Sequence, residues 1–322
     1  MVHVSIIEQR GSMGSTVSER LDMAASDTGS GDRFVTSDGT VLHVRDTGPA
    51  DAPATVLFVH GWTQDNTCWD IAAAEMPDDV RVVRYDHRGH GGSAPARPGT
   101  RTLEQLADDL AEVIDGVVPT GPIVLVGHSM GGMTIMALAE RHPTLVESRV
   151  AGLAFVATSS GNMHRISLGL KGALGRSVPR VEPVLRSLLE RRKKGTLPGS
   201  PRLLSPAARW LVFGKKAKQE YVIETVRQSL GAHPASIGGF MDAIFAHDRR
   251  VALGALRDKP SVVLTGDRDR LCPVDHAKVI ADELPDTDFV LFPGAGHMLM
   301  YERPVEVNAR ILSLLRRAVP TR

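Results

Sequence analysis

Six short and almost wholly apolar runs, each bounded by turn residues, constrain the fold of this chain more than any other sequence feature. They occupy residues 55–61, 80–86, 122–128, 150–156, 261–267 and 288–294. Successive side chains of a strand point to opposite faces of a sheet, so a run that lacks alternation is buried on both faces. Such strands are typical of parallel sheets that helices cover. The runs therefore predict an α/β fold with a mostly parallel, twisted sheet.

Helical patterns separate these runs. Residues 102–117 begin at Thr102, a residue type that caps helices, and repeat apolar residues at spacings of three and four. Residues 130–143 end at a proline, and residues 304–317 contain a further helical pattern. This alternation predicts helices on both faces of the sheet. Before the first run, Asp38-Gly39 lies between two alternating segments and predicts a β-hairpin.

Composition and periodicity divide the chain into four regions. Residues 1–32 are rich in Ser, Gly, Asp and Thr, and we expect a disordered or loosely attached tail. Residues 33–157 and 258–322 carry the strand and helix patterns of the core. Residues 158–257 contain no convincing strand and resemble several helices separated by Gly and Pro. We therefore expect a helical cap inserted between two core strands.

Bulk properties exclude several classes of protein. The formal net charge of +1 gives no signal for a nucleic-acid partner. The sequence contains no run of about 18 apolar residues that could form a transmembrane helix. Its first residues lack the pattern of a signal peptide. Cys68 and Cys272 are too few for a disulfide scaffold, so we expect both to be buried as small apolar residues. These observations favour a cytoplasmic protein.

The segment Gly127-His128-Ser129-Met130-Gly131 carries the first chemical signal. It matches G-x-S-x-G, it follows an apolar strand, and it leads into a helical pattern. A nucleophile in this motif occupies a sharp, strained turn, where small neighbours let the backbone bend without clashes. We therefore predict Ser129 as a nucleophile exposed above a helix N-terminus. We expect the side chain of His128 to be packed and to point away from the serine.

With this elbow, residues 34–317 resemble the α/β-hydrolase superfamily, in its cap-bearing esterase and lipase branch. The resemblance implies the α/β-hydrolase fold and no cofactor. His60-Gly61-Trp62 follows an apolar strand, as in similar proteins, which implies that the backbone N–H groups of Trp62 and Met130 form an oxyanion hole.

The same resemblance places the acid and the base. Residues 266–273 follow a predicted strand and match a G-x-x-D pattern at Asp269, with Asp267 as the competing acid. Gly294-Ala295-Gly296-His297 follows the last strand and implies His297 as the base. The order Ser129, Asp269, His297 is the family's order of nucleophile, acid and base. Serine needs a base to become nucleophilic, and a carboxylate orients the imidazole.

The segment 86–93 resembles a structural loop of the family. We expect Asp86 and Arg88 to hold this loop through ion pairs and main-chain hydrogen bonds. A metal site at Asp86, His87 and His90 is the alternative, but no companion ligand cluster is evident. We therefore expect no metal.

The predicted cap is strongly basic over residues 158–220, which contain 14 Lys and Arg against three Asp and Glu. This charge indicates a solvated helical face, contact with an anionic membrane surface, or an anionic small substrate such as an acyl-CoA. Apolar residues of the cap share one helical face that either lines an acyl pocket or packs into the core: Phe240, Met241, Ile244 and Phe245.

The resemblance implies hydrolysis of a small carboxylic ester with an apolar acyl group, through an acyl-serine intermediate. Carbon–carbon bond hydrolysis, thioester hydrolysis and cofactor-free perhydrolase chemistry use a similar triad and remain open. Aspartate-nucleophile branches are excluded by Ser129 at the elbow. A ligand-binding receptor on the same fold is the alternative that is not an enzyme.

Overall fold

The computed structural model describes residues 32–163, 168, 170, 183–192 and 195–320. The predicted N-terminal tail lies outside the described residues except for Asp32, where the first strand begins. Among the described residues, no helix is long and apolar enough to cross a membrane.

The centre of the molecule is an eight-stranded sheet in the order β1-β2-β4-β3-β5-β6-β7-β8. Strand β2 is antiparallel to both of its neighbours, and the pairs from β4 to β8 are parallel. All six apolar runs form strands, which confirms the mostly parallel sheet. The strands are β1 (Asp32–Val35), β2 (Val41–Thr47), β3 (Thr55–Val59), β4 (Arg81–Tyr85), β5 (Ile123–His128), β6 (Val150–Val156), β7 (Ser261–Gly266) and β8 (Thr287–Phe292).

The predicted hairpin joins β1 and β2. The Thr36 N–H donates to the Thr40 carbonyl oxygen (2.9 Å), and the Gly39 N–H donates to the Thr36 carbonyl oxygen (2.8 Å). Gly39 has a φ of 80°, a left-handed conformation that glycine adopts without steric cost. The Asp38-Gly39 signal is thus confirmed.

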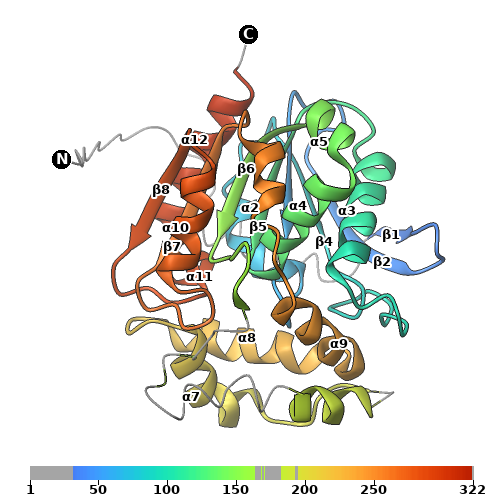
Figure 1. The fold of residues 1–322 in the computed structure, drawn as a ribbon, viewed down its shortest axis with the longest axis vertical. Helices are drawn as coiled ribbons and strands as arrows, with labels where there is room; N and C mark the ends of the chain where they lie inside the picture. Colours follow the sequence, from blue (N-terminus) through green and yellow to red (C-terminus); the bar gives the residue numbers. More distant parts are fainter. Residues whose placement is uncertain (1–31, 164–167, 169, 171–182, 193–194, 321–322) are drawn as a thin grey trace.

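Helices cover both faces of the sheet (Figure 1). One core cluster joins Leu57 and Leu125 to one layer of helices, and another joins Val56 and Val124 to the other layer. Neighbouring strand residues thus belong to different cores, which explains why the runs lack polar positions. The first layer contains α3 (Leu103–Val117), α4 (Met130–Arg141), α5 (Pro143–Arg149) and α10 (Val274–Glu283); the second contains η1 (Asn66–Trp69), α2 (Asp70–Ala74), α11 (Leu299–Glu302) and α12 (Pro304–Ala318).

The described residues between β6 and β7 form helices and no strand, which confirms the helical cap. The helices within residues 201–245 lie beyond the carboxyl ends of the parallel strands (Figure 1). Of the segment 181–194, residues 183–190 are helical, and residues 181, 182, 193 and 194 lie outside the described part. The other helices are α7 (Pro201–Val212), α8 (Gln219–Gly231), α9 (Pro234–Phe245) and η3 (Val251–Leu256).

Helix α9 joins the cap to the core. Phe240 and Ile244 belong to the same buried cluster as α3 and α4, so these two residues pack as core side chains. The His233 N–H, at the start of α9, donates to the Gly89 carbonyl oxygen (2.9 Å). The Ala96 N–H donates to Ser236 Oγ (3.0 Å). These contacts fix the cap helix above the loop that follows β4.

Candidate active site

Ser129 lies at the turn between β5 and α4, in a left-handed conformation with φ 51° and ψ −117°. A non-glycine residue in such a conformation costs about 1–3 kcal/mol and needs its surroundings to hold it. The glycines of the motif meet this need. A Cβ on Gly131 would lie 2.2 Å from the Val59 carbonyl oxygen, and one on Gly127 would lie 2.7 Å from the Gly132 nitrogen. Only glycine lets strand and helix approach this closely.

Hydrogen bonds from the neighbouring strand hold the turn. The Ser129 N–H donates to the Val156 carbonyl oxygen at the end of β6 (3.0 Å). Thr158 Oγ1 donates to the Ser129 carbonyl oxygen (2.6 Å). The Ser129 residue itself is half-buried, so its side chain keeps access to the space above the sheet.

The predicted base and acid are hydrogen-bonded to each other. His297 Nδ1 lies 2.8 Å from Asp269 Oδ2, and both side chains are buried. The other carboxylate oxygen of Asp269 accepts the N–H groups of Leu271 (2.8 Å) and Cys272 (2.9 Å). Because Nδ1 faces a carboxylate, it carries the proton, and Nε2 is left to accept one.

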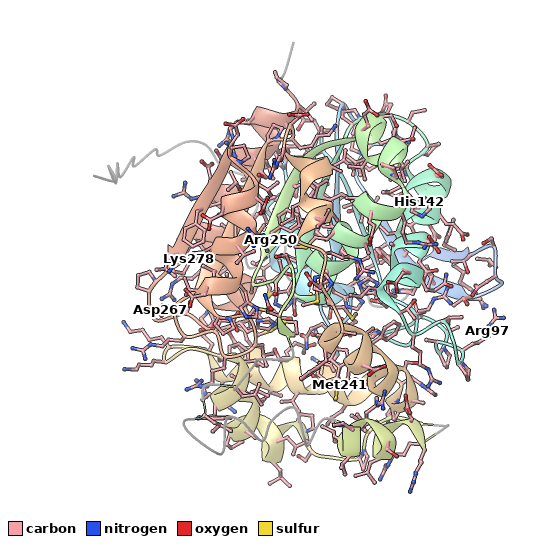
Figure 2. The ribbon with its side chains drawn as sticks, in the orientation of Figure 1. Arg97, His142, Met241, Arg250, Asp267 and Lys278 are labelled. Carbon is pink, nitrogen blue, oxygen red and sulfur yellow. The ribbon has the colours of Figure 1, made fainter. Side chains whose placement is uncertain are left out.

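The competing acid lies elsewhere. The Asp267 side chain is 36% exposed at the edge of the molecule (Figure 2), and its Oδ1 accepts the Gly294 N–H (2.7 Å). It therefore holds the loop before His297 from outside. Asp269, and not Asp267, is the carboxylate that the structure places against the imidazole.

His128 brings the base loop to the elbow. Its Nε2 lies 3.1 Å from the His297 carbonyl oxygen and so must donate, and the two rings are 4.7 Å apart between centroids. Burial lowers the pKa of His128 well below its usual value, and the nearby His297 lowers it further, so the ring is neutral. The expectation of a packed side chain is confirmed. The sequence did not predict that His128 supports the His297 loop, because the variable position of the G-x-S-x-G motif does not indicate a contact with a residue 169 positions away.

The His60-Gly61-Trp62 loop lies beside the serine. A Cβ on Gly61 would be 3.1 Å from Ser129 Cβ and 2.6 Å from His128 Nδ1. The Trp62 indole Nε1 donates to the Ile237 carbonyl oxygen of α9 (3.1 Å), which leaves its main chain at the site and its side chain against the cap. Met130 is the first residue of α4, where helix N–H groups lack intrahelical partners.

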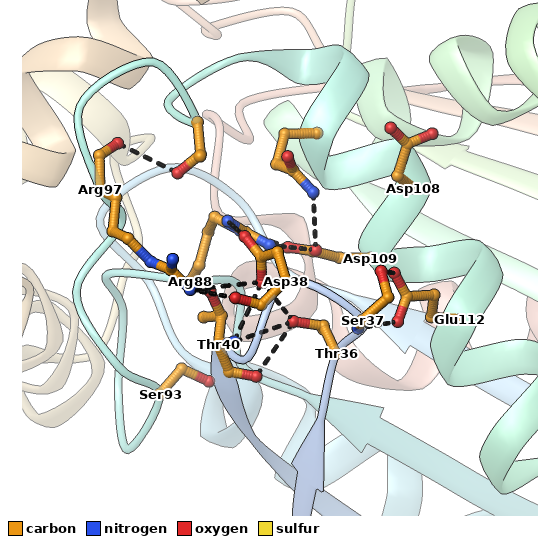
Figure 3. A network of polar contacts seen from close by, with 12 residues as sticks. Thr36, Ser37, Asp38, Thr40, Arg88, Ser93, Arg97, Asp108, Asp109 and Glu112 are labelled. Carbon is orange, nitrogen blue, oxygen red and sulfur yellow. Dashed lines mark hydrogen bonds and ion pairs between the residues drawn. The ribbon is translucent and has the colours of Figure 1, made fainter.

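The loop after β4 is structural, as expected (Figure 3). Asp86 accepts the N–H groups of Asn66 (2.6 Å) and Gly92 (2.9 Å). Arg88 is fully buried between Asp109 (2.6 Å) and Asp38 (2.9 Å). Within the described part of the chain, no three His, Cys, Asp or Glu side chains are arranged to hold a metal ion.

Comparison with known proteins adds the family. The "Alpha/beta hydrolase family" matches residues 56–310. A bifunctional esterase/perhydrolase from Acinetobacter calcoaceticus is 26% identical over 87% of this chain and 98% of its own length. A proline iminopeptidase from Pestalotiopsis fici is 26% identical over 88% of this chain and 98% of its own length. The structure of a thermophilic esterase from Thermogutta terrifontis has a TM-score of 0.72 and 27% identity, over 90% of this chain and 100% of that one. Because the family match covers well over half of the chain, the protein belongs to the α/β-hydrolase family.

Proposed function

We propose that this protein is a serine hydrolase that cleaves carboxylic esters with an apolar acyl group through an acyl-serine intermediate. The observation that carries the proposal is the placement of Ser129 on a strained turn that His128 links to the buried His297–Asp269 pair. Serine, imidazole and carboxylate in this arrangement form the machinery of acyl transfer.

In the first half of the reaction, His297 Nε2 takes the Ser129 hydroxyl proton while Oγ attacks the ester carbonyl carbon. The N–H groups of Trp62 and Met130 donate to the oxyanion, each worth about 3–4 kcal/mol on the scale of oxyanion-hole mutations. The imidazolium then gives its proton to the leaving alkoxide. In the second half, His297 takes a proton from water, the hydroxide attacks the acyl carbon, and Ser129 leaves with the proton returned.

The charge of the cap region favours ester cleavage over the cleavage of an N-terminal amide in this chain. An iminopeptidase substrate carries a positive charge at its N-terminus, whereas residues 158–220 of the cap region contain 14 Lys and Arg against three Asp and Glu. Such a cap repels a cationic substrate. Perhydrolysis is the second candidate, favoured by the esterase/perhydrolase relative, and differs only in that hydrogen peroxide replaces water as the attacking molecule.

Covalent labelling by a fluorophosphonate tests the nucleophile. We expect wild type to be labelled and Ser129→Ala to be unlabelled. Ser159→Ala is the matched control, because Ser159 Oγ also lies near an imidazole, 2.8 Å from His276 Nδ1, but the residue is fully buried. Labelling that persists in Ser129→Ala, or is lost in Ser159→Ala alone, would refute the assignment.

Substrate class is tested with p-nitrophenyl esters of increasing chain length. The competing activities are assayed with an acyl-CoA for thioester hydrolysis, a carbon–carbon hydrolase substrate, and hydrogen peroxide with a carboxylic acid for perhydrolysis. Turnover of the esters above the other three supports the proposal. Tight binding of an ester with no turnover would indicate a receptor instead.

A further inference from the structure

Glu302, the last residue of α11, is a half-buried carboxylate that the triad does not include. Its Oε2 accepts the Gly214 N–H (2.7 Å), and its Oε1 accepts the Gly296 N–H (2.9 Å). Gly214 belongs to the cap, directly after α7 and Phe213. Gly296 immediately precedes the proposed base. One carboxylate thus bridges two segments that lie 82 residues apart in the sequence.

The two bridged segments also contact each other through their backbones. The N–H groups of His297 (2.9 Å) and Met298 (3.3 Å) both donate to the Val212 carbonyl oxygen. A Cβ on Gly214 would lie 2.0 Å from the Gly294 carbonyl oxygen, and one on Gly296 would lie 2.6 Å from the Phe213 carbonyl carbon. Gly214 and Gly296 are therefore required for the main chain of the cap segment to pack directly against the main chain of the His297 loop.

These contacts surround His297 on its backbone side. The N–H of Gly296, the residue before it, donates to Glu302. The His297 N–H donates to the Val212 carbonyl oxygen of the cap, and the His297 carbonyl oxygen accepts from His128. The imidazole orientation is then fixed by Asp269. Two of these supports, Asp269 and Glu302, are carboxylates, and Glu302 is the one that binds the cap and the base loop together. Hydrogen bonds to a carboxylate are stronger than neutral ones.

We propose that Glu302 is a positioning residue that fixes the proposed base by tying the His297 loop to the cap segment Val212–Gly214. This inference rests on the proposed function, since His297 acts as base there. Glu302 does not touch the substrate; it sets where Nε2 of the imidazole lies relative to Ser129 Oγ. The cap segment after α7 is consequently part of the catalytic framework and not a mobile lid.

Glu302→Gln tests the role with little change in shape. A carboxylate accepts both N–H groups, whereas a glutamine amide accepts with its oxygen only and turns an NH₂ donor toward the second N–H. We expect kcat to fall about 10- to 100-fold, because a displacement of about 1 Å at a reacting group has an effect of that size. KM should stay within about two-fold, since ground-state binding of the ester does not use the proton-transfer geometry.

Glu306→Gln is the matched control. It removes the same charge from an exposed residue in the first turn of α12, four positions further along. We expect its kcat and KM to equal those of wild type. Glu302→Asp is the milder variant: it keeps the charge but is one methylene shorter, so it reaches one N–H well, and its kcat should fall between wild type and Glu302→Gln.

A proton NMR signature separates positioning from general structure. The Nδ1 proton between His297 and Asp269 should give a far-downfield resonance in wild type, unchanged in Glu306→Gln and shifted or broadened in Glu302→Gln. Wild-type kcat and an unaltered resonance in Glu302→Gln would overturn the proposal, as would a rise in KM with kcat intact. If wild type is not labelled by the fluorophosphonate, the proposed function is contradicted instead. In that case the comparison of the Nδ1 proton resonance between wild type and Glu302→Gln still reports whether Glu302 holds the imidazole.

Discussion

At the scale of single residues, two carboxylates in one short loop are candidates for the acid that orients His297, and their surroundings distinguish them. Asp269 is buried, faces the His297 imidazole and accepts two main-chain N–H groups, whereas Asp267 is partly exposed and accepts the Gly294 N–H. Only the former can fix the imidazole tautomer and stabilise the imidazolium.

We therefore predict that Asp269→Asn lowers kcat by about 10⁴-fold, the size of the effect when the acid of a serine-protease triad is replaced in this way. Asp267→Asn should lower kcat less than about three-fold, because Asp267 acts only on the loop. Steady-state kinetics with one p-nitrophenyl ester checks both variants. A larger effect at Asp267 than at Asp269 would move the acid to the other residue.

At the scale of elements, the packing of α4 against the end of β3 depends on a glycine. A Cβ at Gly131 would lie 2.2 Å from the Val59 carbonyl oxygen, which is backbone and cannot rotate away. We expect Gly131→Ala to lower the free energy of unfolding by about 1–3 kcal/mol, the usual cost of overpacking. Gly231→Ala, at the end of α8 with nothing within 4 Å of the added Cβ, is the control and should cost nothing. Urea denaturation compares the two; equal midpoints would contradict the prediction.

The elements differ in how far the sequence predicts them. The strands were predictable because residues such as Val56 and Leu57 face different cores, so burial on both faces is visible as an unbroken apolar run. The sequence predicted an apolar helical face in α9 but left open whether it lines a pocket or packs into the core, since an apolar stripe fits both equally well; the structure places Phe240 and Ile244 in the core. The Glu302 contacts were missed: they use main-chain N–H groups, which every sequence offers at almost every position.

At the scale of the whole molecule, several buried neutral histidines make stability depend on pH. Burial lowers the pKa of His60, His87 and His128, and it lowers that of His90 to about 3. In the unfolded chain each group titrates near 6.5, so below that pH the unfolded state binds more protons than the folded state. The free energy of unfolding should therefore be flat near pH 7–8 and fall as the pH drops below about 6.5.

His90→Asn tests this linkage. The asparagine amide can replace the Nδ1 donor that faces the Arg88 carbonyl oxygen (3.2 Å) but cannot titrate. Between pH 6 and pH 4 the variant should lose stability less steeply than wild type, by about 1.4 kcal/mol per pH unit for one proton. Urea denaturation across this range gives the slope. Parallel curves for the two proteins would show that His90 does not contribute.

The outer face of the cap combines apolar and basic side chains, which bears on whether the protein contacts an anionic membrane. Of the large exposed hydrophobic residues, six lie on two cap helices: Val184, Leu185, Leu188, Leu203, Leu204 and Trp210. Arg191, Arg192 and Arg202 are exposed beside them, while Lys193 and Lys194 fall outside the described residues. Apolar side chains that enter the headgroup region and cations that meet anionic lipid stabilise the same orientation, with the cap toward the bilayer.

If this face docks on membranes, the protein should co-sediment with vesicles that contain phosphatidylserine and not with neutral vesicles. Each basic residue near the surface contributes about 1 kcal/mol, so the double variant Arg191→Glu and Arg192→Glu should weaken binding by more than ten-fold. Arg310→Glu, an exposed residue of α12 outside the cap, should leave binding unchanged. Raising the salt concentration should release the protein, because screening shortens the reach of surface charges. Binding that ignores salt and lipid charge, or no binding at all, would leave the basic cap as a solvated surface whose charge acts only on small substrates.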